Sequence, residues 1–181
     1  MAMDINLAEG QRAQRKLLIT VAEWTEEGSE TPNREILGTR TEDSSIELNP
    51  DIETSTDIRG ITYTDVNKTE PQQDFDPHYI MGGSKLDKYL TQAMLKNDIN
   101  KYNGAFNMYI ITAFISESTG TAVQSTSYYA VKHTGCSIIP TSIGGDSYTS
   151  MPLETHFSNN ITEGSVDKIT EDFVFTAEAN I

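Results

Sequence analysis

Between residues 51 and 69 the chain alternates with a period of two. Ile52, Thr54, Thr56 and Ile58 alternate with polar side chains up to Gly60, where the phase shifts, and Ile61 and Tyr63 then continue on odd-numbered positions. Such alternation is typical of a half-buried β-strand, and a glycine between two such runs indicates a bulge or a bend where one strand becomes another. Because few of these positions hold Val or Leu, we expect a long, polar-faced β arm that completes its burial on a neighbouring subunit.

A different period follows the glycine pair at 82–83. Leu86, Tyr89, Leu90, Ala93 and Met94 recur at the spacing of one helix face, while lysines occupy the opposite face. Ser84 stands at the N-cap position, with an acidic residue three positions later. The pattern predicts an amphipathic helix over 84–97, which must cover a sheet because one such helix cannot form a core.

The remaining apolar runs predict strands. They lie at 15–24, 44–47, 105–115, 122–133, 136–139, 153–159 and 168–177, separated by Gly, Ser, Asn or Pro. Prolines at positions 71 and 77 predict a break in regular structure over residues 70–77. One helix among roughly eight strands indicates a mainly β (α+β) fold, a β-sandwich or barrel flanked by the helix. We expect one domain over 15–181, preceded by a flexible arm over 1–14 that orders on assembly.

The balance of charge limits the ligands. Asp and Glu number 27 against 13 Lys and Arg, a formal net charge of -14 at pH 7. Such a chain does not grip DNA or an anionic membrane directly, although an acidic wall suits a conduit whose cargo must slide. With one cysteine, Cys136, there is no intrachain disulfide. No leader sequence and no membrane span are predicted, so we expect synthesis and folding in the cytoplasm.

The sequence gives little support for chemistry. His133, Cys136 and His156 are the candidate ligands for a zinc ion, but strand-end histidines and a buried thiol explain these residues better. The run Gly82-Gly83-Ser84-Lys85 is more consistent with a capped helix start than with a phosphate loop, since the spacing of that motif is missing. We therefore predict no enzymatic activity, no cofactor and no metal.

Three stretches of the sequence resemble the major tail (tail-tube) proteins of long-tailed bacteriophages and prophages. They are EILGTRTEDSSIELNP at 35–50, DIETSTDIRGITYTDVNKTEPQQDFDP at 51–77 and GGSKL at 82–86. The resemblance implies a β-sandwich or barrel whose subunits form hexameric rings that stack into a hollow tail tube, the conduit for DNA. Implied partners are other copies of the chain, the tape measure, tail terminator and distal tail proteins, and DNA as transiting cargo, in a virion tail assembled in the host cytoplasm.

The resemblance also suggests residue roles. On this basis the arm would contact neighbouring subunits through Ile52, Thr54, Thr56, Ile58, Ile61, Tyr63 and Phe75. The acidic residues expected to face the tube lumen are Glu26, Glu27, Glu30, Glu42 and Asp43.

Two other functions compete with the tail tube. A tail terminator or baseplate hub on a similar scaffold would form closed rings that do not polymerise. A monomeric carbohydrate-binding β-sandwich would expose an aromatic platform, for which Tyr128, Tyr129 and Tyr148 are the suggestive residues.

Overall fold

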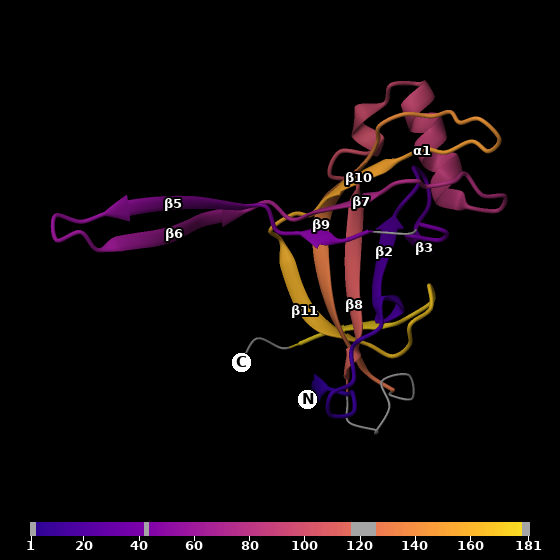
Figure 1. Cartoon of the computed structure of the whole chain (residues 1–181). Coiled ribbons are helices and arrows are strands. Elements are labelled where there is room, and N and C mark those ends of the chain that lie inside the picture. Colours follow the sequence, from indigo (N-terminus) through magenta and orange to yellow (C-terminus); the bar gives the residue numbers. More distant parts are fainter. Residues whose placement is uncertain (1–2, 42–43, 117–125, 179–181) are drawn as a thin grey trace.

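A computed structural model describes residues 3–41, 44–116 and 126–178. This part of the chain is mainly β, and its strands pair antiparallel. It holds one α-helix, which lies at one end of the body, while a hairpin projects far from the body (Figure 1). The predicted class, a β-rich body with one flanking helix and an extended hairpin, is confirmed.

The elements are bounded as follows. The strands are β1 (Asp4–Ile5), β2 (Leu18–Trp24), β3 (Asn33–Ile36), β4 (Ile46–Glu47), β5 (Pro50–Thr56), β6 (Thr62–Thr69), β7 (Gln72–Phe75), β8 (Phe106–Ser116), β9 (Tyr128–Pro140), β10 (Leu153–His156), β11 (Ile161–Val166) and β12 (Phe175–Ala177). The helices are α1 (Lys85–Leu95) and two 3-10 turns, η1 (Arg15–Leu17) and η2 (Ile99–Lys101).

Strand β9 organises the sheet because it has three partners. It pairs with β8 along much of its length, with β11 through residues 128–133 and with β10 through residues 137–140. Beyond β8 the order continues to β2 and β3, and beyond β10 it continues to β7 and β4. The β10-β7-β4 portion therefore branches from the same strand as the β11 portion, and the sheet turns over itself.

The body has two apolar cores. One lies between the sheet and α1 and includes Trp24, Phe75, Leu86, Leu90 and Phe106. The other lies on the opposite side of β2 and β8, around Val21, Tyr109 and Ile111, and is covered by Phe173 from the C-terminal segment. The helix covers a sheet, as predicted, and Ser84 caps it by accepting a hydrogen bond from the Asp87 amide.

Several strand predictions need correction. The two strands expected at 122–133 and 136–139 form one strand, β9, with a register shift at Gly135, whose φ is +82°; residues 122–125 lie outside the described part. The break expected at 70–77 contains strand β7. Of 168–177 only Phe175–Ala177 is strand, and of 153–159 only Leu153–His156. Strands β3 and β11 were not predicted, because their sequences are mostly polar.

At the N-terminus, β1 pairs with the end of β8, and the Asn6 amide donates to the Phe114 carbonyl at 2.8 Å. The predicted division into an arm over 1–14 and a domain over 15–181 stays a prediction.

Candidate assembly interface

The β5–β6 hairpin, here called the arm, forms a two-stranded sheet of its own. It projects from the body as a long ribbon (Figure 1). All seven residues of β5 are exposed, as are those of β6 except Thr69. Isolated two-stranded hairpins are marginally stable in water, since they bury little apolar surface. An arm of this kind gains stability from a surface on which it can lie.

The tip of the arm is held in a defined turn. The Asp57 carboxylate accepts hydrogen bonds from the amides of Arg59 at 2.8 Å and Ile61 at 3.0 Å, and Gly60 takes the positive φ that the turn requires. The hydrogen bond from the Ile61 amide is the main reason that the pKa of Asp57 is lowered. Ile58 stands fully exposed at this tip. The turn presents an apolar side chain on a preorganised end.

The two faces of the arm differ in chemistry. Cross-strand register places Ile52 opposite Val66, Thr54 opposite Thr64 and Thr56 opposite Thr62, so that one face is entirely β-branched and carries no charge. On the other face Glu53 lies directly opposite Asp65, and Ser55 lies opposite Tyr63. Like charges directly opposite each other destabilise an isolated hairpin. The arm thus has one uncharged face and one acidic face.

Six of the seven predicted interface residues lie on the arm. Ile52, Thr54 and Thr56 belong to the uncharged face, Tyr63 to the acidic face, and Ile58 and Ile61 flank the turn. Phe75 lies instead in the core of the body, 1% exposed, because β7 turns this side chain inward toward α1. Sequence reasoning missed Val66, Thr62 and Thr64, although folding the chain back about the turn at 57–61 would have paired them with the predicted residues.

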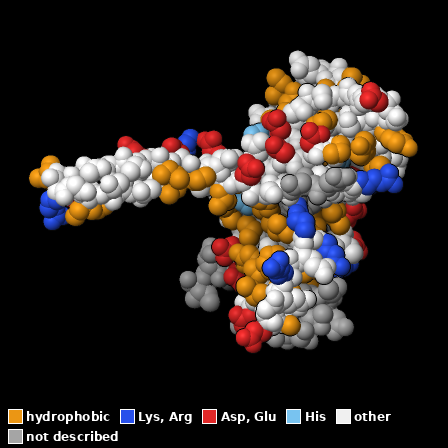
Figure 2. Space-filling view, in the orientation of Figure 1, with side chains coloured by type: hydrophobic (Ala, Val, Ile, Leu, Met, Phe, Trp, Pro, Cys, Tyr) orange, Lys and Arg blue, Asp and Glu red, His pale blue; other side chains and the backbone are white. Residues whose placement is uncertain are grey.

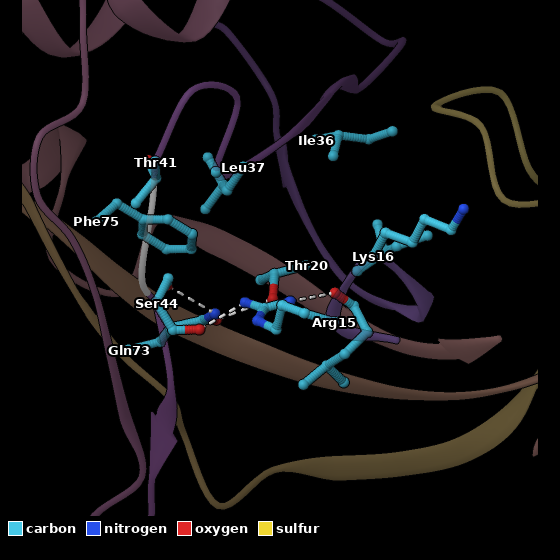
Figure 3. Close-up of a pocket in the computed structure, with 12 residues that line it drawn as sticks. Arg15, Lys16, Thr20, Ile36, Leu37, Thr41, Ser44, Gln73 and Phe75 are labelled. Carbon is cyan, nitrogen blue, oxygen red and sulfur yellow. Dashed lines mark hydrogen bonds between the residues drawn. The ribbon is translucent and has the colours of Figure 1, made fainter. Parts of the chain in front are cut away.

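The root of the arm is anchored by a chain of polar contacts between β2 and β7, which is buried at Thr20 and Gln73 and reaches the surface at Arg15 (Figure 3). Thr20 donates to the Gln73 side-chain oxygen at 2.8 Å, and the Gln73 amide donates to the Ser44 hydroxyl at 3.0 Å. Arg15 donates to the Leu18 carbonyl at 2.6 Å and to the Ser44 carbonyl at 2.5 Å. These groups line a cavity of about 330 Å³. Because these polar groups hydrogen-bond one another, their role is to hold the strands beside the arm in place and not to bind a ligand.

The acidic residues expected in a lumen are only partly described. Glu26, Glu27 and Glu30 lie exposed in the loop between β2 and β3, and the first two border a hollow beside Tyr89 of α1 and Asp98, which follows the helix. Glu42 and Asp43 lie outside the described residues. The lumen assignment stays a prediction.

The residues considered for a zinc site do not form one. The His133 ring bonds the Ser158 carbonyl at 2.9 Å, Cys136 is buried, and His156 is exposed. Over the described ranges there is no group of three or more His, Cys, Asp or Glu placed to hold a metal. At the glycine pair, Glu35 from β3 accepts from the Lys85 and Leu86 amides, so a carboxylate fills the helix N-terminus.

The aromatic residues proposed for a carbohydrate platform are dispersed. Tyr128 is buried in the second core, 4% exposed, whereas Tyr148 is 77% exposed and lies edge-on to Tyr79. Tyr128 and Tyr148 therefore do not share a surface platform.

Comparison with solved structures gives loose likenesses. No family model matches the chain, and no curated protein sequence matches it. Among solved structures, a chain in the cryo-EM structure of the anti-feeding prophage (AFP) baseplate, 6-fold symmetrised, is similar over 80% of this chain and 91% of that chain, with 11% identity and a TM-score of 0.36. A TM-score this low assigns neither a function nor partners. In the described part of the chain, no helix has the length and apolar character to cross a membrane.

Proposed function

We propose that the chain is a non-enzymatic structural protein of a phage tail, which self-associates through its arm into rings that stack as a hollow tube around transiting DNA. The observation that carries this proposal is the arm: a free-standing hairpin whose uncharged face and exposed Ile52 (55%) and Val66 (59%) have no partner surface among the described residues of the same chain. A second copy of the chain can supply such a surface without a different partner protein, because every subunit carries both an arm and a body.

The resemblance of residues 35–50, 51–77 and 82–86 to tail-tube proteins supplies the phage context, the hexameric ring, the virion location and the tape measure, terminator and distal tail partners. Net charge agrees with the proposed conduit. Each copy brings -14, so a ring of identical copies presents few cations to hold phosphates. DNA is cargo in this proposal and not a ligand.

The experiment removes the arm and leaves the body intact. The Glu70 amide already donates to the Leu48 carbonyl at 2.9 Å, and Asn49 already has a positive φ of 43°. Replacing residues 50–69 with a single glycine therefore closes the chain as an Asn-Gly turn, which suits a two-residue hairpin loop. The two cores contain no side chain from the arm, so the shortened protein should fold.

Negative-stain electron microscopy of the concentrated protein should show rings or tubes for the intact chain and dispersed particles for the shortened one. Tubes support the tail-tube function, whereas closed rings that never stack would favour a terminator or hub. Equal assembly of both proteins would contradict the role of the arm, and an intact chain that stays monomeric at every concentration and salt would contradict self-association.

A further inference from the structure

The body carries a second surface that the described residues of the same chain cover only in part; one of its residues, Ile110, also packs against the first core. This surface is one face of the sheet formed by β2, β8 and β9, and its residues are Leu18, Ile110, Thr112, Tyr129 and Val131; we call it the open face. Register places Leu18, Thr112 and Tyr129 in one row, and Ile110 beside Val131 in the next. All five side chains are half-buried. Figure 2 shows hydrophobic side chains gathered on the body below the root of the arm.

The opposite face of the same strands is closed. There Val21, Ile111 and Ala130 are 0% exposed and Tyr109 is 2% exposed, because Phe173 and its neighbours cover them. This sheet is covered on one side, whereas its Leu, Ile, Val and Tyr side chains on the other side stay partly exposed. Such a sheet face indicates a surface that another element covers.

The net charge of the chain limits which part of a second copy can lie on the open face. Each copy carries -14, so most surface segments repel one another. The uncharged face of the arm avoids this repulsion, and it matches the open face in its β-branched character. On the arm, Asp51, Glu53 and Asp65 outnumber Lys68 and leave the root acidic, while at the tip Asp57 and Arg59 balance each other at 3.5 Å.

The rim of the open face carries the complementary charges. Arg15 and Lys16 stand at the β2 edge, where Arg15 bonds the Leu18 carbonyl. Glu163 stands at the β11 edge, opposite Val131. An arm whose acidic root lies at the β2 edge meets Arg15 and Lys16 there, and its electrically balanced tip, not its acidic root, then lies beside Glu163.

The dimensions also agree. The three cross-strand pairs of the uncharged face extend about 13 Å along the arm at the usual strand rise. Crossing from β2 to β9 takes about 10 Å at the usual strand spacing. Packing at a large angle, as in orthogonally packed sheets, therefore lets the uncharged face span all three strands.

We propose that the open face receives the arm of a second copy, laid across β2, β8 and β9 with its uncharged face inward and its root beside Arg15 and Lys16. This inference rests on the self-association proposed above, and it names the surface that receives the arm. Thr56 and Thr62 then lie over β9 near Val131, and Ile52 and Val66 lie over β2 near Leu18.

Disulfide trapping between singly substituted copies tests this contact. The native Cys136 is buried at 1% exposure, so the unsubstituted chain serves as the background. Under mild oxidation, Thr62→Cys mixed with Val131→Cys should give a linked dimer on a non-reducing gel. The matched control is Tyr63→Cys mixed with Val131→Cys, since Tyr63 is the next residue but lies on the acidic face. We expect at least a five-fold difference in yield.

Equal yields for the two mixtures would overturn the assignment of the faces. No link in either mixture, while the intact chain assembles and the chain lacking 50–69 does not, would overturn the receiving surface and leave the proposed function standing. A chain that never assembles would instead fail the electron microscopy test and remove the proposed function itself.

Discussion

Glu23 is the most enclosed carboxylate of the second core and holds several elements together. It lies 2.7 Å from Arg34 Nε, accepts from Asn107 at 2.9 Å and from the Tyr109 hydroxyl at 3.1 Å, and has Lys132 at 4.0 Å. Arg34 in turn stacks on Phe173 at 4.5 Å and donates to its carbonyl at 2.7 Å. The ionised carboxylate therefore links the sheet to the C-terminal segment that covers it.

We predict that Glu23→Gln destabilises the protein by roughly 2 kcal/mol at neutral pH, because a charged hydrogen-bond partner of Arg34 is lost. Burial, the largest single effect on Glu23, raises its pKa, but the hydrogen bonds from Asn107 and Arg34 and the charges of Arg34 and Lys132 together lower it. A folded-state pKa below the ordinary value means that the stabilisation is complete above about 4.5 and is lost as the pH falls through the lower folded-state value.

Urea unfolding of both proteins over a pH series measures this effect. The difference between native and Glu23→Gln free energies should shrink as the pH is lowered below the ordinary glutamate pKa. Glu26→Gln is the matched control, since Glu26 follows the same strand and is exposed. A Glu23→Gln difference that stays constant with pH would show that the charge contributes nothing.

At the scale of one element, α1 begins with two interlocked caps. The Ser84 hydroxyl accepts from the Asp87 amide at 2.9 Å and donates to Glu35 at 2.6 Å. The Glu35 carboxylate, from β3, accepts from the Lys85 amide at 3.1 Å and the Leu86 amide at 3.2 Å. A negative charge at this end also favours the helix dipole.

Ser84→Ala should cost about 1 kcal/mol of unfolding free energy, as the loss of an N-cap usually does, and Glu35→Ala a similar amount. Because the two side chains bond each other, the double variant should cost less than the sum of the single ones. A double-mutant cycle in urea measures the coupling, with Lys88→Ala on the exposed helix face as control. Strict additivity would rule out the interlocked cap.

Local signals predicted α1 well, because the cap residue and the apolar spacing lie within one short segment. The strand β7 was missed for the opposite reason. Its Gln73 is buried at 1% exposure by partners on β2 and at Ser44, and no alternation of apolar residues marks it. Polar side chains that become buried through contacts distant in sequence leave no local pattern.

The arm was predicted as an extended segment with a bulge or bend at Gly60, but the residues that pair across its two strands were not predicted. The alternation in 51–59 identified Ile52, Thr54 and Thr56. The identity of the second row, Val66, Thr64 and Thr62, depends on the centre of the turn, which the Asp57 hydrogen bonds define. The two-faced character of the arm follows from this pairing, because the pairing puts the uncharged positions of both strands on the same side.

On the scale of the whole molecule, the sequence supported a mainly β body with one helix but not the order of its strands. Strand β9 pairs with β8 along much of its length, with β11 at its N-terminal end and with β10 at its C-terminal end. The sequence does not show which partner pairs with which end. The open face is a product of that topology: residues from β2, β8 and β9, distant in the chain, form it together. A candidate receiving surface therefore could not be read from any single segment.

Net charge sets the last prediction, which concerns assembly rate. Every copy carries -14, whereas the proposed contact places only Arg15 and Lys16 beside the root of the arm. Screening shortens the range of electrostatics from about 30 Å at 0.01 M salt to about 8 Å at physiological strength. Repulsion between whole copies acts at long range, so salt removes it before it weakens contacts in the interface. We therefore expect light scattering to show faster assembly at higher ionic strength, and no increase for the chain lacking 50–69. Assembly of the intact chain that is unchanged or slower with added salt would mean that local ion pairs outweigh the net charge.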